Sequence, residues 1–529
     1  MPSLSPTAIP QTPPVDKASL STWIAVTAGA VGAFMAILNI QITNASLLDI
    51  EGGIGTGVDN GAWISTSYLI GEIIVIPLTS YLSRVFSFRN YMIGSTLAFV
   101  LFSMACAFAG NLGQMIAMRG LQGFAGGVLI PMAFTMVVTR LPKPQQPTGL
   151  AMFALAVTFA PAIGPTIGGY LTENYGWRTI FFINSAPGVA MVVALWFTLA
   201  KQPMQLRLLK EGDWAGIVTM AIGLAALQTL LEEGNKDDWF QSSFIVRLAV
   251  VAVVFLTAFI WIELTTEKPL VDLSLLKNRN FTVGTIANVL VGFGLFGSIY
   301  VLPQYLGQVQ GYNAEQIGMV LAWTGLPQLL LIPLVPMLMK RFDIRHITFV
   351  GVALFAASCF MNTHMSLNYS GDQLFWPNVV RAVGQALILT PLTAIAMMSI
   401  QPKDAANASG LFNMLRNLGG TVGTAALGTI VTKREQFHSN IIGHAVTTAR
   451  EEVRQLLDQM TNYFMAHGVS DHAAAQHQAV IALGKTVKRQ ALVMGFSDTF
   501  AVIGIMLAVA AVVVLLARRG QGGSTAAAH

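Results

Sequence analysis

The chain has 529 residues, of which 54% are hydrophobic and only 10% are charged, and it carries a formal net charge of +5. Soluble domains have about 25% charged residues, so this composition excludes an ordinary soluble protein. Repeated apolar runs of about twenty residues can each cross the hydrocarbon layer, which predicts an all-α polytopic protein embedded in membrane lipid. The basic residues lie mostly in short loops between these runs, so the positive charge does not indicate nucleic-acid binding.

The first stretch, residues 1–21, is rich in proline, serine and threonine, which predicts a disordered tail. No small-residue cleavage site follows, so we expect the first apolar run to stay in the protein rather than act as a removed signal peptide. At the other end, residues 518–529 form a second short tail.

We predict fourteen membrane-spanning helices from the apolar runs. Their approximate limits are 22–48, 61–83, 91–110, 114–138, 148–171, 179–200, 213–232, 243–263, 281–303, 314–338, 346–367, 374–399, 408–432 and 493–517. An even number puts both tails on one side of the membrane. The loops on that side carry most of the lysines and arginines, whereas the short loops opposite carry only Arg178 and Lys236. This asymmetry places both termini in the cytoplasm.

The span 22–48 contains two asparagines, Asn39 and Asn44, and the span 61–83 contains a carboxyl group at mid-depth, Glu72. A carboxylate in hydrocarbon is costly, so Glu72 should face a cavity, pair with a cation or hold a proton. Burial favours a neutral carboxyl and a nearby cation favours an ionised one, so moving between such environments would load and unload a proton. We favour that interpretation; the alternative is a protonated or paired structural glutamate.

An internal repeat relates the two ends of the chain. The pattern Arg119-x-x-Gln122-Gly123 in the span 114–138 has a counterpart, Arg381-x-x-Gly384-Gln385, in the span 374–399. The first six spans therefore pair with the last six. This pairing divides the chain into bundles at 22–200 and 281–517, with 201–280 inserted between them.

The pairing of bundles also predicts where substrate binds and which spans touch. Transporters built from two such halves bind substrate near the midplane, at the interface between the halves. We expect 148–171 to contact 314–338, and 61–83 to contact 408–432. The second contact makes Arg416 the candidate partner of Glu72.

Small residues and prolines alternate in the span 148–171. Ala160, Gly164 and Gly168 recur every four residues, so they line one helix face and allow close approach of another helix. Pro161 and Pro165 each lack an N–H group and predict a bend.

Other polar groups lie within the predicted spans. Arg119, Arg381 and Arg416 are each either a hydrogen-bond hub or part of the proton coupling. Asp498 is either a coupling residue or a carboxylate stabilised by the dipole at the start of 493–517. The candidate polar lining of a substrate cavity consists of Asn39, Asn44, Gln122, Arg381, Gln385 and Asn413.

One external connection, 433–492, is much longer than the others, and we predict a helical hairpin there. Its apolar residues fall on one helical face at spacings of three or four; they are Ile442, Val446, Ala449, Val453, Leu456, Met460 and Phe464. Gly468 interrupts this pattern, and Ser470 or Asp471 can cap a second helix. The two helices either simply pack against each other or offer a docking surface to a partner.

The remaining signals do not indicate an enzyme, a metal or a cofactor. Cys106 and Cys359 lie in predicted spans and are expected to be free thiols. The hairpin histidines lack metal-ligand spacing and are expected at a solvated surface; they are His438, His444, His467, His472 and His477. No phosphate-binding loop or hydrolytic triad is present in the sequence, which argues against ATP-driven transport.

The string Gly164-Pro165-x-x-Gly168-Gly169 resembles the antiporter signature of the drug:proton antiporters of the major facilitator superfamily. Further motifs strengthen the resemblance and extend it over most of the chain; they are Trp177-Arg178, Asp213-Trp214-x-Gly216 and Arg416-Asn417-Leu418-Gly419-Gly420. Among the fourteen-helix antiporters, the chain is most similar to the EmrB-like multidrug efflux subfamily of Gram-negative bacteria.

Two places depart from that family's pattern. Asn39 stands where the family commonly has aspartate, and since an amide cannot titrate, Glu72 becomes the more attractive proton site. In the loop after the second span, Ser80 and Arg84 stand where the superfamily's gating motif has glycine and aspartate.

The resemblance implies a secondary exporter in the bacterial inner membrane that moves amphipathic compounds outward against an inward flow of protons. Coupling would involve Glu72, Arg119, Arg416 and Asp498. The hairpin would meet a periplasmic adaptor (a membrane fusion protein) and, through it, an outer-membrane channel. Two alternatives are an exporter of one endogenous metabolite or lipid, and a transport-inactive scaffold whose hairpin recruits partners.

Overall fold

The computed structural model describes residues 17–518, apart from 57, 267–268, 402–403 and 448. Within these ranges every regular element is a helix, as the composition predicts. Most of both expected tails, 1–21 and 518–529, lies outside the described residues.

The helices follow in chain order, with short 3₁₀ turns in several connections. The first part contains α1 (Leu20–Ala45), α2 (Leu47–Ile54), α3 (Val58–Val85), α4 (Phe88–Ala107), α5 (Leu112–Gly126), α6 (Leu129–Arg140), α7 (Gln146–Tyr175), α8 (Thr179–Phe182) and α9 (Ser185–Thr198). The inserted part contains α10 (Trp214–Glu233) and α11 (Ser243–Thr265). The last part contains α12 (Arg279–Gln308), α13 (Ala314–Leu331), α14 (Val335–Arg341), α15 (Ile344–Met361), α16 (Gly371–Ala386), α17 (Leu389–Met397), α18 (Ala405–Ala445), α19 (Glu451–Ala466) and α20 (His472–Leu515).

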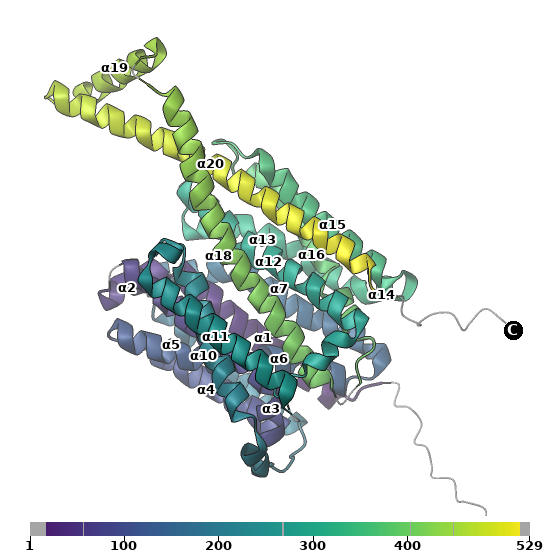
Figure 1. Ribbon diagram of the computed structural model, residues 1–529. Helices are drawn as coiled ribbons and strands as arrows, with labels where there is room; N and C mark the ends of the chain where they lie inside the picture. Colours follow the sequence, from purple (N-terminus) through teal and green to yellow (C-terminus); the bar gives the residue numbers. More distant parts are fainter. Residues whose placement is uncertain (1–16, 57, 267–268, 402–403, 448, 519–529) are drawn as a thin grey trace, which may run out of the picture.

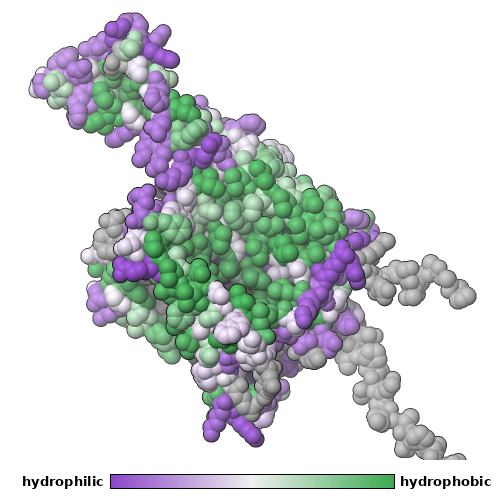
Figure 2. All heavy atoms as spheres, viewed as in Figure 1, coloured by the Kyte–Doolittle hydropathy of each residue, from purple (hydrophilic) through white to green (hydrophobic). Residues whose placement is uncertain are grey.

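Long helices run side by side through the molecule, and their outer surface carries an apolar belt. Figure 1 shows the helices packed into one bundle, and Figure 2 shows apolar residues over its flank with hydrophilic residues at both ends. This distribution is the one expected when hydrocarbon surrounds the middle of the protein. The fold is that of a polytopic membrane protein.

Twelve helical stretches among the described residues are long and apolar enough to cross a membrane, and α7, which bends by 46° beside Pro161, supplies a thirteenth. The predicted count of fourteen is therefore not reached by this criterion. The missing stretch is α18, at the predicted span 408–432. Many of its side chains are polar, including Ser409, Asn413 and Arg416, because it packs inside the bundle against α3, α6, α12 and α20.

Both predicted contacts between spans are confirmed. α7, at 148–171, packs along α13, at 314–338, and α3, at 61–83, packs against α18. Near the end of α3, Ser80 donates a hydrogen bond to Asn407 of α18. The residue in the gating-motif position thus joins the two parts of the chain directly.

The external hairpin has three helical segments rather than two. α18 and α20 both continue beyond the bundle, and α19 lies at the far end (Figure 1). The face predicted over Ile442–Phe464 is not one helix, because α18 ends at Ala445 and α19 begins at Glu451. The β-branched run that starts at Val446 disfavours helix and explains this break. As predicted, the helical pattern is interrupted at Gly468, which has a φ of 101°, and of the two candidate caps it is the Asp471 side chain that caps α20.

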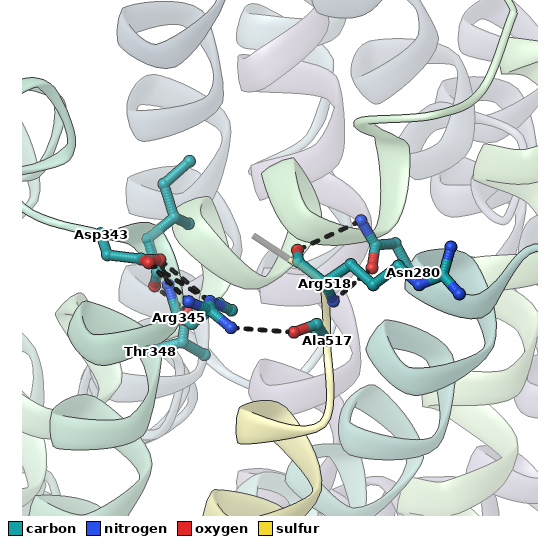
Figure 3. Close-up of polar contacts among 7 residues, drawn as sticks. Asn280, Asp343, Arg345, Thr348, Ala517 and Arg518 are labelled. Carbon is teal, nitrogen blue, oxygen red and sulfur yellow. Dashed lines mark hydrogen bonds and ion pairs between the residues drawn. The ribbon is translucent and has the colours of Figure 1, made fainter. Parts of the chain in front are cut away.

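Polar contacts at the opposite end of the bundle join α12, α15 and the end of α20 (Figure 3). Asp343 caps α15 and forms an ion pair with Arg345 at 2.8 Å, and Arg345 donates to the Ala517 carbonyl at 3.1 Å. The Arg518 amide donates to Asn280 at 2.8 Å. These bonds hold the end of α20 beside the starts of the other two helices.

We predict that Asp343→Ala destabilises the protein by about 1–2 kcal/mol, because it removes a helix cap and an ion pair. Asp343→Asn keeps the cap and should cost less than about 1 kcal/mol. The hydrogen bond from Arg345 lowers the pKa of the Asp343 carboxyl. Its contribution is therefore complete above the ordinary carboxyl pKa of about 4 and is lost as the pH falls below it. Thermal unfolding of the purified protein against pH measures both effects; an equal melting temperature for wild type and Asp343→Ala would contradict them.

Candidate functional site

Glu72 lies in the middle of α3 and faces the protein interior, with 6% of its surface exposed. Its Oε2 atom has no hydrogen-bond partner among the described residues. Glycines bring α3 against α5 and the start of α6: a Cβ on Gly71 would meet the Gly120 carbonyl, and one on Gly127 would lie 2.9 Å from the Glu72 Cα. This backbone contact fixes the position of Glu72 relative to α5.

Two buried arginines act electrostatically on Glu72. They are Arg416 of α18 and Arg119 of α5. Glu72 takes part in none of the ion pairs within 4.0 Å among the described residues. Arg416 is thus a near neighbour of Glu72, as the predicted contact between α3 and α18 requires, and is not its bonded partner.

Arg119 is the centre of a hydrogen-bond network and is fully buried. Its Nη1 donates to Asn39 Oδ1 at 2.6 Å and to Gln122 Oε1 at 2.7 Å, and its Nε donates to the Ile64 carbonyl at 3.2 Å. The guanidinium also lies 4.3 Å from the centre of the Tyr68 ring. Arg119 therefore joins α1, α3 and α5 through neutral acceptors, and Asn39 is one of them.

The antiporter motif in α7 contacts a neighbour that its spacing did not identify. A Cβ on Gly164 would meet Gln41, and one on Gly168 would lie 2.9 Å from the Ile42 carbonyl, so this face packs on α1. The contact with α13 uses another face of α7, where Thr166 meets Gly318. Pro165 lies between the two glycines, and Gly169 is buried beside Gly168.

A second group of buried polar residues lies in the last part of the chain. Arg381 and Gln385 are one turn apart on α16. The Gln328 side chain of α13 donates to Gln385 Oε1 at 3.0 Å. Gln328 is not among the predicted site residues, although an amide within the apolar run 314–338 was a usable signal.

A small cavity of about 10 Å³ lies where Arg416 and Asn413 approach α6 and α7. Its walls include Phe134 and Leu150 from the first part of the chain and Thr390 from α17. The Asn413 amide donates to the Ser409 carbonyl at 2.9 Å. This volume is below the 300 Å³ or more of typical ligand pockets, so a substrate entering here requires the helices to move apart.

Two other predicted site residues, Asn44 and Asp498, lie away from Glu72 and the buried arginines. Asn44 is exposed at the end of α1, where it accepts a hydrogen bond from Ser65 at 2.6 Å. Asp498 is not at a helix start, because α20 begins at His472. It pairs with Arg434 at 2.6 Å and His438 at 2.8 Å on α18. His438 is accordingly buried rather than solvated, because α18 and α20 enclose it.

Comparison with known proteins decides the family. Residues 29–424 match the family model described as Major Facilitator Superfamily. The colistin resistance protein EmrB of Acinetobacter baumannii is 34% identical over 95% of this chain and 97% of its own length. The multidrug export protein EmrB of Escherichia coli K12 is 30% identical over 94% of this chain and 96% of its own length. This chain belongs to the EmrB-like branch of the major facilitator superfamily.

Further matches agree with this assignment. The fatty acid resistance protein FarB of Neisseria gonorrhoeae is 30% identical over 97% of this chain and 99% of its own length. The solved structure of the proton:xylose symporter XylE covers 93% of this chain and 94% of its own chain with a TM-score of 0.59, at 13% identity, and supports the fold alone. The EmrB-like chain is an integral membrane transporter and not an enzyme.

Proposed function

We propose that this transporter exports amphipathic organic compounds across the bacterial inner membrane in exchange for protons. The observation that carries the proposal is Glu72: a buried carboxyl with an unbonded oxygen, within electrostatic range of arginines on α5 and α18. Three relatives support export as the direction of transport, because their names refer to colistin resistance, multidrug export and fatty acid resistance.

The two arginines have different parts in this mechanism. Arg119 moves with Glu72, because glycine contacts join α3 to α5. Arg416 is on α18, so rocking of the bundle 281–517 against the bundle 22–200 changes its distance to Glu72. While Arg416 is near, the ionised carboxyl is favoured; when it moves away, burial favours the protonated form. Each cycle then carries one proton inward as substrate moves outward.

Proton release on substrate binding tests the proposal. Purified transporter in weakly buffered solution should release protons when an exported compound is added, because the proposed cycle couples substrate binding to loss of the proton on Glu72. A pH indicator records the change, and Glu72→Gln is the control that should release none. A wild-type protein that binds the compound without any proton release would overturn proton coupling and favour the scaffold alternative.

A second candidate function is export of one class of endogenous lipid or metabolite, which the name of the FarB relative favours. Resistance profiling separates the two functions. A strain expressing this transporter should resist several structurally unrelated amphiphiles if the function is broad. Resistance confined to one chemical class would favour the dedicated exporter.

We further propose that both termini are cytoplasmic and that the hairpin formed by the outer ends of α18 and α20 with α19 binds a periplasmic adaptor. Several apolar side chains of this hairpin are exposed in the part beyond the bundle; they are Leu456, Tyr463, Met465, Val480 and Ile481. Exposed apolar groups of this kind mark interaction surfaces. An adaptor there would pass substrate on to an outer-membrane channel.

Replacing residues 447–470 with a short glycine-serine linker tests this docking surface. We expect proton-driven transport into inverted membrane vesicles to stay within about two-fold of wild type, because α19 lies outside the bundle. Resistance of whole cells that also express the adaptor should fall to the level without the transporter. Retained resistance at equal expression would show that the hairpin is not needed for delivery.

A further inference from the structure

Of the three arginines that the sequence places in the spans, Arg381 differs from the others in its surroundings. Glu72 acts electrostatically on both Arg119 and Arg416. The titratable neighbour of Arg381 is instead Cys359 on α15. Among the described residues, Arg381 takes part in none of the ion pairs within 4.0 Å.

Arg381 is also poor in hydrogen bonds. Its side chain is 4% exposed, its Nε has no partner, and none of the hydrogen bonds found among the described residues uses its guanidinium. The Phe355 ring, 5.7 Å from the guanidinium carbon, is its aromatic neighbour. By contrast, Arg119 donates three hydrogen bonds to protein acceptors.

Gln385, one turn from Arg381 on α16, has a second donor without a partner. Gln385 Oε1 accepts from Gln328 Nε2 at 3.0 Å, and Gln328 Nε2 also donates to the Thr324 carbonyl at 2.5 Å. The Gln385 Nε2 atom is buried and has no partner. Gln328 Oε1 is an unpaired acceptor, which a hydroxyl group or a water molecule can satisfy. Two unused donors and one full positive charge are thus gathered on α16.

This group lies close to the seam between the two halves. α13, which carries Gln328, packs along α7, and α17, which continues α16, also contacts α7. Thr390, little more than one turn beyond Gln385, lines the small cavity shared with Arg416. Gln385, one turn from Arg381, bonds to Gln328 of α13, so separation of α7 from α13 would open a path from the seam toward this pair.

A buried cation without an anion is unstable in a membrane interior, and an arginine there normally faces a partner or a substrate pathway. The guanidinium fork matches a carboxylate in shape and charge, because it can donate two parallel hydrogen bonds. The unused Gln385 donor adds a third bond to the same group. A carboxylate supplies the acceptors and the negative charge that this site lacks.

We propose that Arg381 and Gln385 bind the carboxylate head group of an amphipathic substrate, while the apolar body of the substrate lies in the seam between the halves. The proposal rests on the export function proposed above and names its substrate class. The residues of this site are distinct from Glu72, so substrate charge and the coupling proton occupy different places.

Binding of two ligands that differ only in the head group tests the proposal. Purified full-length transporter in zwitterionic nanodiscs at pH 7.5 is titrated with dodecanoate and with dodecan-1-ol. We expect wild type to prefer dodecanoate. Arg381→Gln should weaken dodecanoate binding by about ten-fold or more, the usual effect of losing a charge-assisted pair, and leave dodecan-1-ol binding unchanged. Arg381→Lys keeps the charge without the forked guanidinium, so its affinity for dodecanoate should lie between those of wild type and Arg381→Gln.

The matched control is Arg247→Gln. Arg247 is an exposed arginine on α11, and this variant should bind both ligands as wild type does. If Arg381→Gln does not fold, Gln385→Leu removes a donor from the same site and should also reduce the preference for dodecanoate. Unchanged dodecanoate binding in the folded variant, or an equal loss of both ligands, would overturn the proposal. This measurement needs no proton gradient. Normal proton release with no head-group preference therefore rejects this site alone, and head-group preference without proton release rejects the coupling alone.

Discussion

Glu72→Gln is expected to reduce proton-driven export to the background of vesicles without the transporter, while substrate binding stays within about two-fold of wild type. Glutamine has nearly the shape of glutamate, so the contacts of α3 with α5 and α18 persist. It cannot release a proton, so the cycle loses its coupling step. Transport in proteoliposomes with an imposed pH gradient measures the loss, and calorimetric binding of the same compound measures what remains.

Glu263→Gln is the matched control for this experiment. Glu263 is also a buried glutamate, but it is on the inserted helix α11, where its Oε2 accepts a hydrogen bond from the Val271 amide at 3.0 Å. We expect this variant to keep proton-driven export. Full transport by Glu72→Gln would remove Glu72 from the mechanism, and loss in both variants would show only that buried carboxyls are needed for folding.

Gly318→Ala is expected to open the contact between α7 and α13 and to make the membrane leaky to protons. A Cβ at this position would lie 2.9 Å from the Thr166 Cα and closer still to the hydroxyl, so backbone must shift rather than one flexible side chain. α7 and α13 come from different halves, so the shift acts on the seam itself. We expect proton leak without substrate to rise several-fold and active export to fall by about ten-fold or more.

Leak is measured as the decay of a pH gradient across proteoliposomes that contain no substrate. Gly307→Ala is the control, because the nearest atom to its Cβ would be the Ile317 side chain at an ordinary 3.8 Å. This variant should hold the gradient as wild type does. If Gly318→Ala holds the pH gradient and exports normally, the α7–α13 contact is not a seal against protons.

The hydrophobic pattern and the internal repeat predict much of the fold. The contacts of α7 with α13 and of α3 with α18 follow from pairing the first six spans with the last six. The criterion of apolarity failed at α18, because this helix lies inside the bundle and exposes little of its polar side to lipid. Polar residues that are costly in lipid are tolerated when neighbouring helices enclose them.

The candidate site was predicted in part. Glu72, Arg119, Arg416 and Asn39 were each visible as polar groups in apolar runs, because such residues are rare at that depth. Their pairing was not visible: Asn39 meets Arg119, and Asp498 meets Arg434 and His438. The spacing of Gly164 and Gly168 indicated a close helix contact and could not say that the neighbour is α1.

Membrane insertion, the helical class and the depth of each charged group follow from composition and order along the chain, since the bilayer acts on every span separately. The direction that each helix face points depends on how all the helices pack together. Only that packing leaves Arg381 without an anion, brings Arg416 near Glu72 and turns the antiporter motif toward α1. Side chains far apart in the chain meet because van der Waals contact and buried hydrogen bonds select one rotation for each helix, and no local pattern contains that choice.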